Sequence, residues 1–166
     1  KQRKNNPHGI LKYFKNCSRY IDDLLMINND GHMIKVMSDI YPKELVLVPD
    51  DTDGLSCPFL DLQIVIKNNI ISTSIFDKRD AFDFPIVNFP TFRGNIPKKS
   101  SYGVFIGELV RYARACTYYE DFLKRTTSLI INVKKQAFTN TGLKAALSNF
   151  VASHIFGPRV LSLFET

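Results

Sequence analysis

The stretch Arg19-Tyr20-Ile21-Asp22-Asp23-Leu24-Leu25 places two adjacent aspartates between apolar residues. Side chains on a straight strand alternate between its two faces, so adjacent aspartates there would point in opposite directions. Both can project toward one point only at the end of a strand or in a tight turn. The apolar residues on either side therefore predict a hairpin across residues 10–30, with both aspartates at its tip.

Two carboxylates at the tip of a hairpin are suited to a divalent metal ion. Mg²⁺ prefers oxygen ligands, and two-metal phosphoryl transfer uses aspartates that hold both ions against a phosphate. Asp22 and Asp23 are thus candidate ligands for Mg²⁺ or Mn²⁺. Tyr20 would either pack near an incoming nucleotide or cover the underside of the hairpin. Paired acids also occur in solvated turns and at helix starts, so the motif needs support from elsewhere in the chain.

Composition limits the class of protein. The chain has 166 residues, of which 45% are apolar and 23% charged, enough for one core or two small subdomains. No apolar run is long enough to span a membrane, no signal peptide opens the chain, and its first residue, Lys1, suggests a piece of a longer protein. The three cysteines are widely separated, which indicates neither a zinc site nor a disulfide framework. We expect an intracellular protein, in the nucleus or the cytoplasm, that does not bind membranes.

Charge is distributed in three blocks along the chain. Residues 1–19 carry six Lys/Arg and no acid, residues 20–83 have a net charge of −7, and residues 84–166 have a net charge of +7. An acidic centre between basic segments suits a site that gathers divalent cations while its walls bind a polyanion. Blocks of this size also arise on ordinary solvated surfaces, so the pattern favours nucleic-acid binding without establishing it.

Periodicity predicts strands in the first half of the chain. A short helix is expected to end near Ile40, followed by a buried strand at residues 45–48. Residues 59–66 alternate as a strand, Asn68-Asn69 predicts a turn, and residues 70–76 return as the second arm of a hairpin.

Helical periodicity begins at Tyr102, after a Pro-rich connector whose phenylalanines predict an ordered segment. Thr141 is a plausible cap for the last helix. The apolar stripes expected to face the core of a small bundle are Phe105, Leu109, Tyr112 and Cys116; Phe122, Ile130, Val133 and Ala137; and Leu143, Leu147, Phe150, Val151 and His154. The fold class predicted is α+β, with antiparallel hairpins and a helix followed by a small all-α bundle.

Several short sequence motifs, in this order, resemble those of the reverse transcriptases of Penelope-like retroelements, which are relatives of telomerase. Besides the aspartate motif, they are Ile40-Tyr41-Pro42-Lys43-Glu44-Leu45, Pro58-Phe59-Leu60-Asp61-Leu62, Asp77-Lys78-Arg79-Asp80-Ala81-Phe82-Asp83-Phe84, Tyr102-Gly103-Val104-Phe105 and Leu109-Val110-Arg111-Tyr112-Ala113-Arg114. The resemblance runs from about residue 17 to about residue 138.

This resemblance implies a partial polymerase palm in residues 1–80, a connector in residues 81–101 and a helical thumb in residues 102–166. It implies that Asp22 ligates a catalytic metal ion with Asp23 beside it. The region of Phe59, Leu60 and Asp61 would lie where such enzymes grip the primer end. The family's first catalytic aspartate and its fingers belong upstream of this chain.

The parent would be an RNA-directed DNA polymerase of a retrotransposon, working on an RNA/DNA primer–template together with the missing N-terminal palm and fingers. Without the upstream aspartate, this chain alone is expected to be inactive. Residues expected to contact the nucleic acid are basic positions along two helices: Arg111, Arg114, Lys124, Arg125, Lys134 and Lys135. On any other bundle the same residues would be ordinary surface charge.

Two alternatives stay open. One is a catalytically inactive nucleic-acid-binding module derived from such an element, because residues 141–166 hold only Lys144 and Arg159 as basic residues. The other is a metal-dependent nuclease using Asp22, Asp23 and Asp61, although it lacks the Lys or His that usually accompanies such acids. Asp77-Lys78-Arg79-Asp80 carries both charges and favours internal ion pairing as much as nucleic-acid contact.

Overall fold

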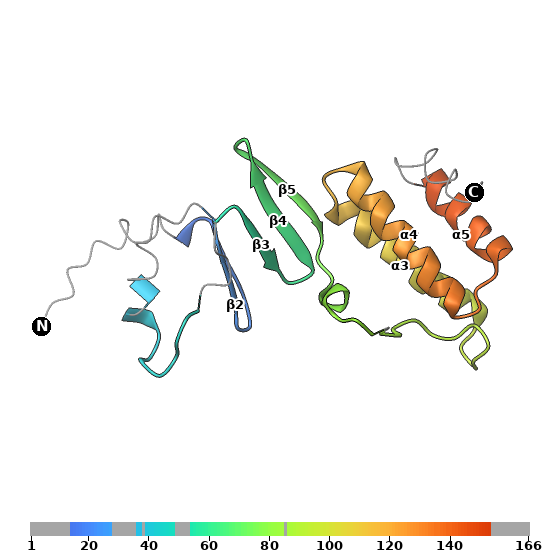
Figure 1. The fold of residues 1–166 in the computed structure, drawn as a ribbon, viewed down its shortest axis with the longest axis horizontal. Helices are drawn as coiled ribbons and strands as arrows, with labels where there is room; N and C mark the ends of the chain where they lie inside the picture. Colours follow the sequence, from blue (N-terminus) through green and yellow to red (C-terminus); the bar gives the residue numbers. More distant parts are fainter. Residues whose placement is uncertain (1–13, 28–35, 38, 49–53, 85, 154–166) are drawn as a thin grey trace, which may run out of the picture. The chain divides into compact units, whose positions relative to one another are not determined.

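The computed structural model describes residues 14–27, 36–37, 39–48, 54–84 and 86–153, and the following account is restricted to them. The chain separates into two compact units, residues 1–54 and residues 55–166. Each unit is described by itself. The elements are antiparallel hairpins followed by a helical bundle (Figure 1), so the predicted α+β class is confirmed.

The first unit contains a hairpin of β1 (Cys17–Tyr20) and β2 (Asp23–Met26). The strands are antiparallel, with Cys17 opposite Met26 and Tyr20 opposite Asp23, so Ile21 and Asp22 form a two-residue turn. The predicted hairpin is therefore confirmed for residues 17–26, with Asp22 in its turn and Asp23 at the start of β2, whereas residues 10–13 and 28–30 of the predicted range lie outside the described residues.

The strand predicted at residues 45–48 is wrong. These residues form no strand, and Val46 and Val48 are 77% and 80% exposed. An apolar run becomes a strand only where a neighbour completes its hydrogen bonds, and none of the described strands pairs with it. Of the helix expected from Asp30 to about Ile40, residues 36, 37, 39 and 40 are helical, and residues 30–35 and 38 lie outside the described residues.

The second unit begins with a three-stranded antiparallel sheet of β3 (Ser56–Phe59), β4 (Leu62–Lys67) and β5 (Ile70–Ile75), in the order β3-β4-β5. Asn68 and Asn69 form the predicted turn between β4 and β5, and both have positive φ, which asparagine tolerates. The single strand predicted over residues 59–66 is wrong, because a turn at Leu60 and Asp61 ends β3 and starts β4.

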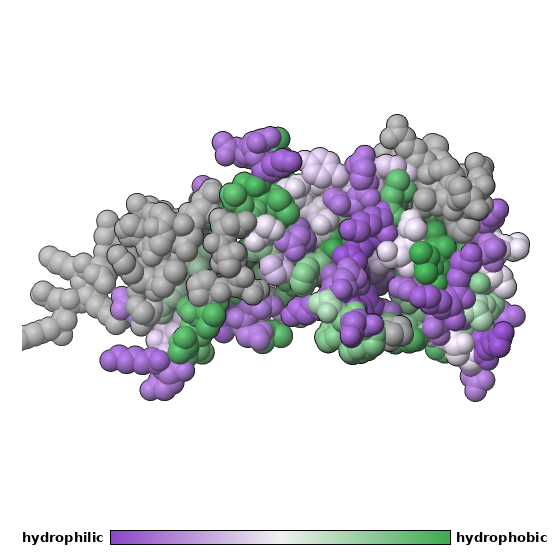
Figure 2. All heavy atoms as spheres, in the orientation of Figure 1, coloured by the Kyte–Doolittle hydropathy of each residue, from purple (hydrophilic) through white to green (hydrophobic). Residues whose placement is uncertain are grey.

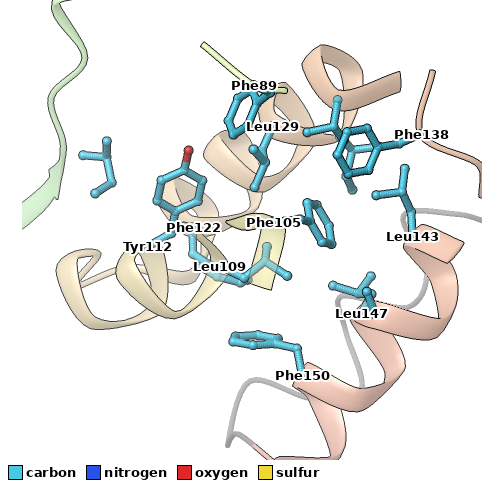
Figure 3. Close-up of a cluster of buried hydrophobic side chains, with 14 of the residues drawn as sticks. Phe89, Phe105, Leu109, Tyr112, Phe122, Leu129, Phe138, Leu143, Leu147 and Phe150 are labelled. Atoms are coloured by element: carbon cyan, nitrogen blue, oxygen red, sulfur yellow. The ribbon is translucent and has the colours of Figure 1, made fainter. Parts of the chain in front are cut away.

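Three helices form the bundle of the second unit: α3 (Lys98–Ala115), α4 (Tyr119–Lys135) and α5 (Asn140–Ser153). Helix α3 begins four residues before the predicted start. Most of the predicted stripe residues are buried, with Phe105, Leu109, Val133, Leu143 and Leu147 completely inaccessible. Ala137 and Val151 are only partly buried, and position 154 lies outside the described residues. Figure 3 shows the side chains of α5 directed toward Phe105 and Leu109 of α3.

The connection between α4 and α5 differs from the prediction at both ends. Ala137, expected in the stripe of α4, follows the helix with φ of 66°, and the amide of Phe138 donates to the carbonyl of Val133. This helix-ending motif turns Phe138 into the core. The cap of α5 is Thr139 rather than Thr141, because the Thr139 hydroxyl accepts a hydrogen bond from the amide of Gly142 at 3.2 Å.

Gly142 permits the close packing of α5 against α3. A Cβ atom at this position would lie 1.9 Å from the hydroxyl oxygen of Tyr102, which no side chain could occupy without displacing the tyrosine. The same hydroxyl lies 3.2 Å from the Thr139 hydroxyl. Tyr102 also contacts the rings of Phe92 and Phe138, so the connector, α3 and the α4–α5 link meet at one aromatic cluster.

Polar contacts attach β5 to the bundle. The amide of Thr117 donates to the carbonyl of Thr73 at 2.8 Å, and the Thr73 hydroxyl donates to the carbonyl of Ala115 at 2.7 Å. At the end of β5, Arg125 of α4 donates to the carbonyl of Ile75 at 2.9 Å. The sheet and the bundle of the second unit are thus joined by backbone groups that would otherwise lack partners along one edge of the sheet.

The connector contains a 3₁₀ helix, η1 (Lys78–Ala81), and then irregular chain. Phe89 is buried and Phe92 packs against the core, as expected for an ordered segment. The phenylalanines of an ordered connector are expected to be buried. Phe82 and Phe84 instead contact each other and are more than half exposed. Among the described residues, no helix is both long and apolar enough to cross a membrane.

Candidate metal and nucleic-acid site

The turn between β1 and β2 has an unusual backbone. Ile21 adopts φ of 51°, in the left-handed region that β-branched residues normally avoid. Asp22, the second turn residue, is not among the residues with positive φ. Holding a non-glycine residue in this region costs on the order of 1–3 kcal/mol, and such strain concentrates at functional sites.

Arg19 supports this strained turn. Its Nε atom donates to the carbonyl oxygen of Ile21 at 2.9 Å, and its guanidinium donates to the Tyr41 hydroxyl at 2.7 Å. The guanidinium also lies over the Tyr41 ring, 5.3 Å from its centroid. Sequence reasoning assigned no role to Arg19 or Tyr41. The available signal was that both lie within the short stretches from which the family resemblance was inferred.

Asp22 and Asp23 are exposed at this tip, and their carboxylates make no hydrogen bond or ion pair with any described residue. Their oxygens are therefore available to a ligand. Mg²⁺ keeps several waters and is commonly bound through one or two carboxylates, so this donor set suits part of a magnesium site. No cluster of three or more His, Cys, Asp or Glu occurs in the part of the chain that the structure describes.

Tyr20 lies directly opposite Asp23 at the end of the hairpin and is 55% exposed. The ring is therefore only half covered by the described residues. The two roles considered for it, packing near a nucleotide or covering the hairpin, both stay predictions.

The turn between β3 and β4 repeats the local pattern of the first turn. Phe59, Leu60 and Asp61 match Tyr20, Ile21 and Asp22 in being aromatic, aliphatic and acidic. Leu60 also has positive φ, at 58°, and is 41% exposed. Here, however, the carboxylate is occupied, because Asp61 Oδ2 accepts from Arg111 at 3.0 Å.

Arg111 is held by two carboxylates. Besides Asp61, its guanidinium donates to Glu108 Oε2 at 2.7 Å, and it lies 5.5 Å from the centre of the Tyr112 ring. Burial alone would lower the pKa of Arg111, but the charge and hydrogen bond of Glu108 outweigh burial and raise it. Burial, reinforced by the charge of Glu108, raises the pKa of Tyr112 to about 12.

Arg125 also makes an internal ion pair, with Asp80 at 2.6 Å. The neighbouring pair of Arg79 and Asp77 is bidentate, and the hydrogen bond from Arg79 lowers the pKa of Asp77. The segment Asp77 to Asp80 therefore makes internal ion pairs, one of the two roles considered for it.

The other basic residues expected to bind nucleic acid are exposed: Arg114, Lys124, Lys134 and Lys135. None of them makes an ion pair with a described residue. Figure 2 shows a largely hydrophilic face over the helices, interrupted by separate hydrophobic side chains. The structure thus divides the six basic positions into two that are internally paired and four that are available.

A cavity of about 210 Å³ lies between η1, the connector and the C-terminal end of α4. Its acidic lining residues, Asp77 and Asp80, are the ones paired with arginines, so it offers no free carboxylates for a metal ion. Arg79, Lys135 and three amide side chains complete its polar lining.

Comparisons with family models, with curated proteins and with solved structures found no match to this chain.

Proposed function

We propose that this chain is the palm-hairpin and thumb portion of an RNA-directed DNA polymerase of the Penelope-like kind. Asp22, with Asp23 beside it, ligates Mg²⁺ or Mn²⁺, and the exposed cations of α3 and α4 contact the phosphates of an RNA/DNA primer–template. In the intact enzyme the primer 3′-hydroxyl attacks the α-phosphate of a dNTP. Asp22 and Asp23 would hold part of the metal site, and bound ions would supply Lewis-acid activation of that hydroxyl and charge neutralisation of the pyrophosphate.

The observation that carries the proposal is the tip of the β1–β2 hairpin. A left-handed isoleucine, whose carbonyl oxygen accepts from Arg19, precedes two carboxylates at an exposed turn that make no ion pair with a described residue. A solvated turn with no function would gain stability from asparagine or glycine at Ile21. The strained residue and the free carboxylates together support a site selected for binding a cation.

The hairpin also supports the proposed partners. An isolated two-stranded hairpin is marginally stable in water, and β1 and β2 pair only with each other among the described strands. We propose that its sheet is completed by strands outside the described residues, in the remaining palm and fingers. The first catalytic aspartate would be supplied by the same region.

Substoichiometric Mn²⁺ added to the ¹⁵N-labelled chain tests the metal site. The amide signals of Asp22, Asp23 and Leu24 should broaden before those of other acidic residues. Asp22→Asn should abolish this selective broadening. Asp61→Asn is the matched control, since it alters the equivalent turn residue of the other hairpin, and it should leave the broadening unchanged.

Broadening spread evenly over exposed acids such as Glu120 would contradict the proposal. It would favour the alternative of an inactive nucleic-acid-binding module, which needs no metal ion at Asp22. A nuclease that uses Asp61 as a metal ligand is less well supported, because that carboxylate is already engaged by Arg111.

A further inference from the structure

Arg111 and Arg114 lie three residues apart on α3 but differ in their surroundings. Arg114 is exposed and makes no ion pair with a described residue, whereas Arg111 is partly buried between two carboxylates. The Nε atom of Arg111 is buried, which excludes it from contact with a ligand in solution. Each terminal nitrogen of Arg111 already donates to a carboxylate, Nη1 to Asp61 and Nη2 to Glu108, and these two acids offset its charge toward a phosphate.

We infer that Arg111 is a positioning residue that ties the Leu60–Asp61 turn to α3, rather than a residue that binds phosphate. Its planar fork reaches two carboxylates at once, Glu108 on its own helix and Asp61 on the turn. The contact with Glu108 holds the guanidinium against its own helix. The contact with Asp61 then holds the turn at a defined distance from that helix.

The consequence is geometric. The strand that contacts the bundle most extensively is β5, at the edge of the sheet, where Thr73 and Ile75 are attached to the helices. The turn between β3 and β4 has the Arg111 contact as its own tie to α3. Its backbone also supports β5, since the Phe76 amide donates to the Asp61 carbonyl at 2.9 Å.

This inference rests on the proposed function in one respect, which is that the turn lies at the primer end and the bundle on the duplex. With the Arg111–Asp61 contact intact, the turn and the bundle are held at a fixed spacing. The turn can then contact the recessed primer end while the bundle contacts the neighbouring duplex. The chain should therefore bind a duplex with a recessed 3′ end better than a blunt duplex of the same length.

Three substitutions in the full chain separate a tie from a phosphate contact. Arg111→Gln removes both the ion pair with Asp61 and any contact of this residue with a phosphate. Arg111→Lys keeps the charge but loses the fork that reaches two carboxylates. Asp61→Asn leaves Arg111 in place and replaces its ion pair with the turn by, at most, a weaker neutral hydrogen bond. The matched control is Arg114→Gln, which alters an exposed, unpaired cation on the same helix.

Binding to both duplexes is measured over a salt series. If Arg111 is a tie, Arg111→Gln, Arg111→Lys and Asp61→Asn all reduce the preference for the recessed end to parity and leave the salt slope unchanged. Arg114→Gln keeps the preference and lowers the log–log slope by about 0.9, the value for one lost phosphate contact on B-DNA. Retained preference in the three variants overturns the inference. So does tighter binding by Asp61→Asn, or a slope reduced by Arg111→Gln but not by Arg111→Lys.

Hydrogen exchange in the free chain provides a readout that does not depend on nucleic acid. The Phe76 amide should exchange several-fold faster in Arg111→Gln and Asp61→Asn than in the parent, and at the parent's rate in Arg114→Gln. Absence of duplex binding with faster exchange would contradict the proposed function but retain the tie. Unchanged exchange would overturn the tie itself.

Discussion

The two hairpin turns of this protein are alike in sequence and backbone but differ in the fate of their aspartate. Both place an aromatic residue at the end of a strand, a left-handed aliphatic residue next and an aspartate after it. Asp61 is paired with Arg111, whereas Asp22 and Asp23 have no partner among the described residues. The same turn geometry therefore attaches the turn to α3 in the second unit, whereas in the first unit it leaves both carboxylates without a partner among the described residues.

The difference teaches that a motif alone does not identify a metal site. The helix packed against the second turn supplies a cation, which satisfies the carboxylate and removes its need for a ligand. The described residues near the first turn supply an arginine to the backbone carbonyl of Ile21 and none to the carboxylates. Four experiments test this comparison.

The largest effect is expected from Phe105→Ala. This side chain is completely buried in the bundle, and its loss should destabilise the second unit by about 3–5 kcal/mol through lost burial and the cavity left behind. Urea denaturation followed by the signals of each unit measures the effect. Selective Mn²⁺ broadening at Asp22 should persist, and its loss would show that the first turn depends on the bundle.

A smaller effect is expected from Arg125→Ala, which removes the ion pair with Asp80 and the hydrogen bond to the Ile75 carbonyl. Loss of charged hydrogen bonds at a partly buried site should cost about 1–2 kcal/mol of unfolding free energy. Lys124→Ala, one residue earlier and exposed, is the control and should change stability by less than about 0.5 kcal/mol. Equal effects of the two variants would mean that Arg125 does not help attach β5 to the bundle.

Asparagine at the left-handed positions should stabilise both turns. Ile21→Asn and Leu60→Asn place a residue that tolerates positive φ where the native residue is strained, and each should gain about 0.5–1 kcal/mol. Leu60→Asn is measured by denaturation of the second unit, and Ile21→Asn by hydrogen exchange in the first hairpin. A loss of stability at either position would mean that packing of the aliphatic side chain outweighs its backbone strain.

The smallest effect on stability is expected from substituting the two turn aspartates, Asp22 and Asp61. Asp61→Asn should cost roughly 0.2–1 kcal/mol, as expected for a partly exposed ion pair. Asp22→Asn removes no ion pair with a described residue and should leave the stability of its hairpin unchanged or slightly raised, since it also relieves repulsion from Asp23. Thermal or chemical denaturation at low salt is the appropriate measurement. A cost at Asp22 equal to that at Asp61 would remove the distinction between a free and an occupied carboxylate.

The sequence alone determined the elements whose pattern is local. The aspartate pair between apolar residues predicts the first hairpin, Asn68-Asn69 predicts a turn, and helical stripes such as Phe105, Leu109 and Tyr112 predict the buried faces of the bundle. These predictions succeed because side-chain periodicity and turn chemistry depend on residues close together in the chain.

Only the tertiary structure decided which charges are free. Asp61 and Arg111 are 50 residues apart, as are Ile75 and Arg125, and no spacing rule connects them. It also showed that residues 45–48 form no strand and that Leu60-Asp61 interrupts one. Strand pairing and ion pairing both require a partner that is brought into place only when the chain folds, so residues with the same local pattern acquire different roles.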